Sequence, residues 1–224
     1  MLNTKLFTCL FAVSFASLAV AQDRSTAQVK AAFEKAKIPQ DLHIKFNPEF
    51  LLDVTFPQPG GQSVPVSAGI VLPRSETAGP PQFAIGNDFG LEIGQRFVIA
   101  AVDPDAPTPQ NTSLAQIRHF VGSDFVFKSG KISVERPLKN LTVPVSPWLQ
   151  PSPPAGSDPH RYIFLIYRQP KGFDNQTVVT PGGGDAALEH FDVAAFAKET
   201  NLGNPIAGTF IIVSPDACES IITI

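Results

Sequence analysis

Two carboxylates in this sequence stand where an apolar strand must end. The run at residues 97–102, Phe-Val-Ile-Ala-Ala-Val, is short and rich in β-branched residues, which predicts a buried strand. Asp103-Pro104-Asp105-Ala106-Pro107 follows it directly. Because proline fixes φ and lacks the N–H that a sheet ladder needs, the strand cannot continue through this run. The sequence therefore predicts a stiff turn that holds Asp103 and Asp105 at a strand end.

Two histidines and a tyrosine lie at the starts of later strands. His119 opens the next apolar segment, and His160 and Tyr162 begin the most apolar strand, residues 160–168. Side chains alternate faces along a strand, so His160 and Tyr162 point the same way. We expect Asp103, His119, His160 and Tyr162 to converge on one cavity. A histidine at the start of a buried strand can also be a core residue with satisfied hydrogen bonds, and that alternative stays open.

These residue types suit a ligand that carries both charges. Histidine and tyrosine supply the N–H and O–H donors that a phosphate-sized anion needs, and Asp103 or Asp105 could receive an ammonium group. A phosphoethanolamine head group has both parts. The alternative for the acids is that Asp105 pairs with Arg161 or caps the turn.

The elements that must position these residues are short and bounded by proline and glycine. Both faces of the strand at 160–168 are apolar, which indicates a central strand covered on both sides. The pattern favours a β-sandwich with long loops. The other expected elements are helices at 26–37 and 186–200 and strands at 50–56, 62–72 and 210–213.

The N-terminus has the pattern of an export signal. Lys5 gives the positive region, residues 6–18 the apolar core, and Ala19-Val20-Ala21 the cleavage motif. The apolar run is short for a transmembrane span, although an uncleaved anchor is the alternative. We therefore expect cleavage after Ala21, secretion, and a single β-rich domain at residues 22–224, a length at which one all-β unit is common.

The net charge, the cysteine count and the sequons limit the kinds of partner and modification that we expect. The formal net charge is −3, so neither a nucleic-acid footprint nor a polybasic membrane patch is indicated. With Cys9 in the signal, Cys218 is alone in the mature chain, which excludes an internal disulfide; we expect it to be a buried thiol, with a reactive or dimer-forming one as the alternative. Three sequons predict glycosylation at surface loops, at Asn111, Asn140 and Asn175.

The motifs together resemble the phosphatidylethanolamine-binding protein family, which includes the Raf kinase inhibitor protein, the plant flowering regulators and the yeast carboxypeptidase Y inhibitor. The similarity rests on Asp-Pro-Asp-Ala-Pro at 103–107, on His-Phe at 119–120, and on Pro-Pro-Ala-Gly followed by His-Arg-Tyr within 153–162. The resemblance spans about residues 41–213, nearly the whole mature chain, and includes Leu-Gly-Asn-Pro at 202–205. It implies two antiparallel sheets with peripheral helices and a small anion pocket at one end.

The family's pocket residues can be carried over one by one. The resemblance implies roles for its paired acids at Asp103 and Asp105, its histidines at His119 and His160, its tyrosine at Tyr162, and pocket walls at Pro107, Pro154 and Arg161. Ile117 stands where relatives have an aromatic residue, residues 148–154 contain fewer glycines and an extra proline, and Cys218 falls near a usual aromatic. These departures bear on the ligand and on the shape of the phosphate cradle.

Three classes of function follow. The favoured one is a secreted binding protein for phospholipid head groups or small anions, with at most peripheral membrane contact. The second is an inhibitor of a serine carboxypeptidase, since inhibitory surfaces lie outside the pocket motifs. An enzyme is not expected, because no serine or cysteine forms a recognisable nucleophile motif with His119 or His160. No cofactor and no metal are expected either, and His-Glu-x-x-His is absent from the sequence.

Overall fold

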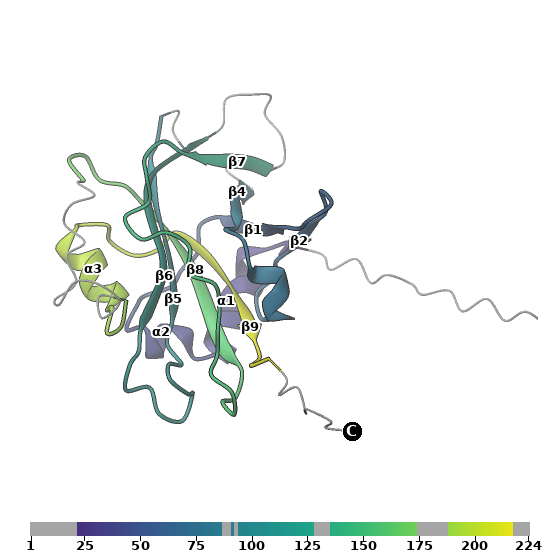
Figure 1. The fold of residues 1–224 in the computed structure, drawn as a ribbon. Coiled ribbons are helices and arrows are strands. Elements are labelled where there is room, and N and C mark those ends of the chain that lie inside the picture. The colour runs from purple at the N-terminus through teal and green to yellow at the C-terminus, as the bar shows by residue number, and fades with distance from the viewer. Residues whose placement is uncertain (1–21, 87–90, 92–93, 128–134, 174–187, 217–224) are drawn as a thin grey trace, which may run out of the picture.

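The structure, a computed structural model, describes residues 22–86, 91, 94–127, 135–173 and 188–216 (Figure 1). The chain is mainly β, as predicted. Its helices are α1 (Thr26–Lys35), α2 (Ile38–Asp41), the 3-10 helix η1 (Arg74–Thr77) and α3 (Val193–Glu199). Its strands are β1 (Leu51–Pro57), β2 (Ser63–Pro65), β3 (Ile70–Leu72), β4 (Gln82–Gly86), β5 (Phe97–Asp103), β6 (Ile117–Phe127), β7 (Glu135–Asn140), β8 (His160–Arg168) and β9 (Ala207–Val213).

The strands form one curled sheet in the order β2-β1-β4-β7-β6-β5-β8-β9-β3. The two sheets of the predicted sandwich are continuous with each other, because β7 pairs with both β4 and β6 and so joins the two halves. A departure from the predicted antiparallel pairing is the parallel pair of β3 with β9. The halves nevertheless face each other across a shared core, as in a sandwich (Figure 1).

Two apolar cores lie on opposite faces of the sheet. The first fills the space between the two halves, and the second lies between the sheet and the helices α1 and α3. Strand β8 contributes to both, because its side chains alternate: Tyr162, Phe164 and Ile166 enter the first core, and Ile163, Leu165 and Tyr167 enter the second. The predicted central strand with two buried faces is confirmed.

Helix α1 begins where a cap is available. The side chain of Ser25 accepts a hydrogen bond from the backbone N–H of Gln28, and Val29 and Phe33 form the buried stripe. The helix ends at Lys35, two residues earlier than predicted, because Lys37 adopts a left-handed φ of 56°. Helix α2 follows at once and carries Asp41 toward the strand ends.

Two sequence-based elements differ from the structure. The helix expected at 186–200 begins only at Val193, where Asp192 caps it; residues 186–187 lie outside the described part. Before Val193, the backbone forms hydrogen bonds with residues at the start of β6. Phe191 N–H donates to Gln116 O, and Arg118 N–H donates to Leu188 O. The strand expected at 62–72 is two short strands, β2 and β3, on opposite edges of the sheet.

Candidate functional site

A chain of hydrogen bonds runs through His160 at the start of β8. The Nδ1 atom of His160 lies 2.8 Å from Asp103 Oδ2, and its Nε2 atom lies 2.9 Å from Ser157 Oγ. Both His160 and Asp103 are buried, with 1% and 3% of their surface exposed. A buried carboxylate must be paired or hydrogen-bonded, so Asp103 fixes the orientation of the imidazole.

The turn after β5 explains why Asp103 points at β8. The other oxygen of its carboxylate, Oδ1, accepts a hydrogen bond of 2.7 Å from the backbone N–H of Asp105. This bond closes the turn around Pro104, and β5 pairs directly with β8. A side chain at the end of β5 therefore meets the beginning of β8.

His119 and Tyr162 lie against this chain, His119 from β6 and Tyr162 from β8 itself. Their rings contact edge to face with centroids 4.8 Å apart, and the rings of His160 and Tyr162 are 6.4 Å apart. Nδ1 of His119 donates to the carbonyl of Leu149 at 2.9 Å. The structure thus brings Asp103, His119, His160 and Tyr162 together.

Burial controls the ionisation of the two rings. Desolvation lowers the pKa of His119, and the charge of Asp103 and the hydrogen bond to Leu149 oppose this only in part. Desolvation likewise raises the pKa of the Tyr162 hydroxyl, and the charge of Asp103 adds to the effect, while a backbone hydrogen bond from Ser152 opposes it. The site therefore keeps Tyr162 as a neutral O–H donor.

Trp148 forms the apolar wall beside His119. Its indole stacks on Phe164 with ring centroids 6.0 Å apart, and it lies 6.4 Å from the ring of His119. Its Nε1–H donates to the carbonyl of Thr77 in η1, which fixes the wall from outside the sheet. It is the single tryptophan in the sequence, so its fluorescence reports on this site alone.

Asp105 belongs to the opposite side of β8. Arg161 holds it with a bidentate pair, Nε to Oδ2 at 2.9 Å and NH2 to Oδ1 at 2.6 Å, and also contacts Asp41 at 2.8 Å. The alternative that Asp105 pairs with Arg161 is thus confirmed. Burial lowers the pKa of Arg161, but its bonds to Asp105 and Asp41 outweigh this and raise it overall. Asp105 is therefore committed to the fold.

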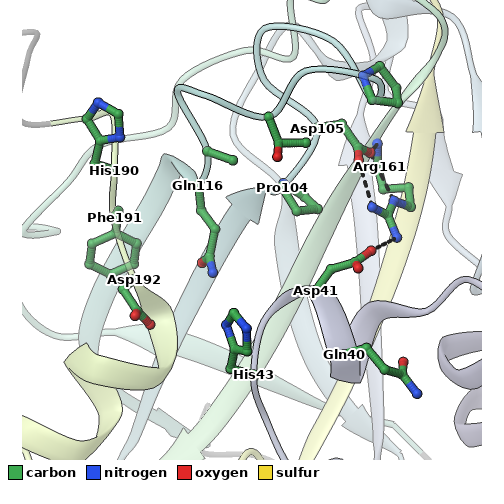
Figure 2. A pocket seen from close by; sticks show the side chains of 13 residues that line it. Gln40, Asp41, His43, Pro104, Asp105, Gln116, Arg161, His190, Phe191 and Asp192 are labelled. Carbon is green, nitrogen blue, oxygen red and sulfur yellow. Dashed lines mark hydrogen bonds and ion pairs between the residues drawn. The ribbon is translucent and has the colours of Figure 1, made fainter.

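A separate polar cavity of about 570 Å³ opens on that side. Figure 2 shows Asp41 and Asp105 around the Arg161 guanidinium at one wall, with His190 and Asp192 at the other and Gln116 between them. The two remaining residues that the sequence placed at the pocket, Pro107 and Pro154, lie in turns. Pro107 is half-buried in the turn after Asp105, and Pro154 is exposed, with its carbonyl accepting from the N–H of Ser157.

Ser157 is the residue of the His160 chain that the sequence did not reveal. A hydroxyl three residues before a strand-opening histidine is its only signal, and glycine and proline around it obscure the geometry. A serine, a histidine and an aspartate joined in this order resemble a nucleophile with its base, but Ser157 Oγ also lies 2.8 Å from the carbonyl of Asp158. A hydroxyl has one hydrogen. When the Nδ1–H of a neutral His160 ring donates to the Asp103 carboxylate, its Nε2 atom is an acceptor, so the Asp158 carbonyl and His160 Nε2 compete for the single hydrogen of Ser157.

Metal binding has no support in the described ranges. No group of three or more His, Cys, Asp or Glu side chains there is arranged to hold a metal ion. Two of the sequon asparagines, Asn111 and Asn140, are among the described residues, and the third, Asn175, is not. The predicted buried thiol, Cys218, also lies outside the described residues. No helix of the described segments is long and apolar enough to cross a membrane.

Comparison with known proteins gives consistent results. The family model "Phosphatidylethanolamine-binding protein" matches residues 61–211. Protein FLOWERING LOCUS T of Arabidopsis thaliana is 29% identical over 78% of this chain and 86% of its own length. The carboxypeptidase Y inhibitor of Saccharomyces cerevisiae is 28% identical over 70% of this chain and 81% of its own length.

Solved structures of related proteins have a similar fold. A carboxypeptidase Y inhibitor complexed with its cognate proteinase superposes with a TM-score of 0.71 at 25% identity, covering 85% of this chain and 96% of that one. A phosphatidylethanolamine-binding protein of Plasmodium falciparum has a TM-score of 0.58 at 20% identity, over 82% and 96% of the two chains, and shows the shared fold. The family model covers more than half of the sequence, and this chain belongs to the phosphatidylethanolamine-binding protein family.

Proposed function

We propose that this protein binds a small anion, the phosphate of a phospholipid head group in particular, at the cluster of Asp103, His119, His160 and Tyr162. The observation that carries the proposal is the convergence of two histidines and a neutral tyrosine hydroxyl beside one buried carboxylate. Imidazole N–H and phenol O–H groups are donors to phosphate oxygens, and a charged donor makes the shorter and stronger bond.

The head group's ammonium needs a carboxylate that is still accessible. Asp105 is held by Arg161, and both oxygens of Asp103 already accept hydrogen bonds. Asp158 is exposed and follows Ser157 directly in the chain. We expect the phosphate to bind at the histidines and the ammonium to lie toward Asp158, so that the ligand spans the buried cluster and its rim.

Phosphate and phosphoethanolamine should bind saturably and quench or shift the fluorescence of Trp148. Replacing His160 with alanine should weaken binding by roughly 1.5–3 kcal/mol, the worth of a charged hydrogen bond. His160→Asn is the variant that protects the fold, because its amide can still donate to Asp103 while the Nε2 atom that faces Ser157 is lost. His190→Ala, an exposed change in the other cavity, is the control. Equal affinities for all four proteins would contradict the site.

Affinity for the anion should increase as the pH falls. Burial holds the pKa of His119 below its usual value, and a bound anion beside the ring would raise it. Binding then takes up a proton, so affinity rises with falling pH and continues to rise below about pH 6.5, the unperturbed value. Titrations with sulfate, whose charge is constant in this range, measure the protein's own contribution. Because the pKa of His119 is lowered, the titration must extend from about pH 7.5, above the normal range of histidine, down to the lowest pH at which the protein stays folded, and a flat profile over that range would exclude His119 as a titrating ligand contact.

Inhibition of a serine carboxypeptidase is the second candidate function. The observation that favours it is the 0.71 TM-score to an inhibitor solved with its proteinase. Inhibition that survives His160→Ala would place the inhibitory surface outside the cluster. We expect no catalysis, since the carbonyl of Asp158, 2.8 Å from Ser157 Oγ, competes with His160 for the hydrogen that a nucleophilic serine must give to its base. Labelling of Ser157 by a fluorophosphonate probe, or ester hydrolysis lost in Ser157→Ala, would overturn that expectation.

Export is part of the proposal. Residues 1–21 lie outside the described part, and the chain directly after them is fixed: Asp23 Oδ2 accepts a hydrogen bond of 2.9 Å from Ala68 N–H and lies 3.5 Å from Thr209 Oγ1. Burial raises the pKa of Asp23, and these two bonds lower it, with burial dominant. A fold that includes Asp23 supports cleavage after Ala21 and a mature chain that starts at Gln22.

A further inference from the structure

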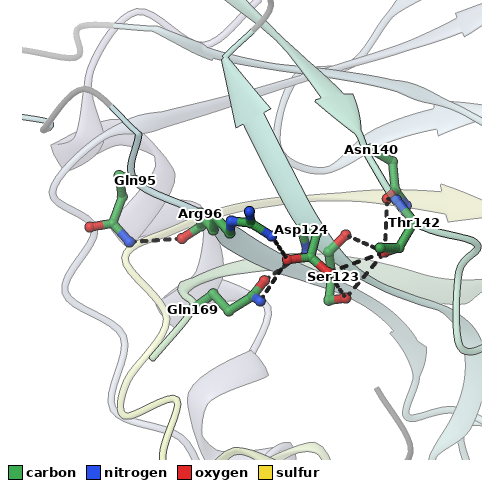
Figure 3. Close-up of polar contacts among 7 residues, drawn as sticks. All are labelled: Gln95, Arg96, Ser123, Asp124, Asn140, Thr142 and Gln169. Carbon is green, nitrogen blue, oxygen red and sulfur yellow. Dashed lines mark hydrogen bonds and ion pairs between the residues drawn. The ribbon is translucent and has the colours of Figure 1, made fainter. Parts of the chain in front are cut away.

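The sequon at Asn140 is built into a corner of the sheet. Asn140 ends β7, and its Oδ1 accepts hydrogen bonds from the backbone N–H of Thr142 at 2.9 Å and from the Thr142 hydroxyl at 3.4 Å. The same hydroxyl lies 3.3 Å from Asp124 Oδ2 and 3.4 Å from the carbonyl of Ser123 (Figure 3). Both sequon side chains therefore contact the sheet.

Asp124 connects this corner to the neighbouring strands. Its carboxylate also accepts from Arg96 and from Gln169 Nε2, at 2.5 and 2.9 Å, and its backbone N–H donates to Gln169 Oε1 at 2.7 Å. Figure 3 shows these side chains meeting at Asp124, with Asn140 and Thr142 on the far side. Displacing Thr142 would disturb contacts between segments far apart in sequence.

The atom that would carry a glycan at Asn140 has no access to solvent. Nδ2 is buried and has no hydrogen-bond partner among the described residues. It lies against the backbone of Gly122, where a Cβ atom would approach it to 3.1 Å. An N-linked sugar is bulky and needs a surface position. The folded protein has no room for one at this nitrogen.

Asn111 has the opposite environment. It is exposed in the turn after Pro109, with its backbone N–H donating to the carbonyl of Thr108 at 2.9 Å. Its Oδ1 accepts a hydrogen bond of 3.2 Å from the N–H of Ser113, as Asn140 Oδ1 does from Thr142, but the Asn111 side chain is exposed to solvent. Ser113, the third sequon residue, is exposed as well.

We propose that Asn111 is an N-glycosylation site of this protein and that Asn140, despite its intact sequon, carries no glycan in the folded, exported chain. The inference rests on the proposed export. Thr112, the residue after Asn111, lines the 570 Å³ polar cavity, so the glycan stands at the rim of that cavity. A chain that received a sugar at Asn140 could not close the corner at Thr142.

The test is to secrete the full chain from a glycosylating eukaryotic host, once with its own N-terminus and once behind a leader that the host is known to cleave. Enzymatic glycan release in heavy-oxygen water marks each occupied asparagine for peptide mass spectrometry. Asn175→Gln removes the third sequon, leaving two sites, and Asn111→Gln added to it removes the exposed one. Asn111→Gln should not affect folding, because the side chain is exposed.

With the host leader, we expect a single occupied site at Asn111 in Asn175→Gln protein, and none in the double variant. A glycan found at Asn140 of folded, secreted protein would overturn the proposal, as would an unoccupied Asn111. The chain with its own N-terminus tests export separately: secreted material should begin at Gln22. Its failure to leave the cell would contradict export, while occupancy behind the host leader still decides between the two sequons.

Discussion

Arg161→Ala is expected to lower the free energy of unfolding by about 3–5 kcal/mol, the usual cost of removing one partner of a buried ion pair. Only 3% of the Asp105 side chain is exposed, and Arg161 satisfies both of its oxygens. The same guanidinium contacts Asp41 and the carbonyl of Ala36, which close α1 and α2 against the strand ends. The variant leaves the charge of Asp105 buried without its counterion.

Arg168→Ala is the matched control, at the other end of the same strand. Its pair with Glu49 is bidentate as well, at 2.9 and 2.8 Å, but the side chains are 40% and 50% exposed. An exposed pair is worth about 1 kcal/mol or less. Urea denaturation of both variants, compared at equal m-values, measures the difference. Similar losses for Arg161 and Arg168 would show that burial does not strengthen the first pair.

Phe164→Ala should also cost about 3–5 kcal/mol of unfolding free energy, the range for deleting a buried aromatic side chain. Phe164 is completely buried and contacts three aromatic rings, Phe56, Phe83 and Trp148, at centroid distances of 6.3, 6.3 and 6.0 Å. The cavity left behind would release Trp148, so its fluorescence should shift to longer wavelength and phosphate affinity should fall.

Phe164→Leu separates volume from aromatic contact. A swap that nearly conserves volume usually costs less than about 1.5 kcal/mol. The leucine variant should therefore fold with near-normal stability and keep Trp148 close to its native emission. If alanine at this position changed neither stability nor the tryptophan spectrum, the stacked wall beside His119 would not contribute to the core.

The sequence was informative where side-chain alternation decides the structure. On β8 the period of two, with apolar residues at almost every position, requires a central strand, and the predicted faces of Tyr162 and Ile163 are confirmed. The proline turn after Val102 likewise predicted where β5 ends, because no ladder can continue through Pro104. These two facts place Asp103 and His160 at strand ends, and the ends meet because β5 pairs with β8, which the sequence did not show.

Tertiary contacts decided the parts that the sequence could not. Residues 188–192 have helical spacing, but their backbone forms hydrogen bonds with residues at the start of β6. Asp192 then caps a shorter helix. Ser157 has no periodic pattern at all, because it sits in a turn whose shape depends on Pro154. The sequence also did not show that Asp103 and Asp105 have different roles. The direction of each carboxylate depends on its partner, which is His160 for Asp103 and Arg161 for Asp105.

The sheet order has a consequence for self-association. The strands at its two ends, β2 and β3, are consecutive in the chain and come from residues 63–72. Each spans three residues, and a very short edge strand is a poor template for pairing with another molecule. A cut or deletion in this segment would uncover the longer strands β1 and β9 together. One local lesion would thus open two surfaces for intermolecular strand addition, and the resistance of the whole sheet to aggregation depends on this segment.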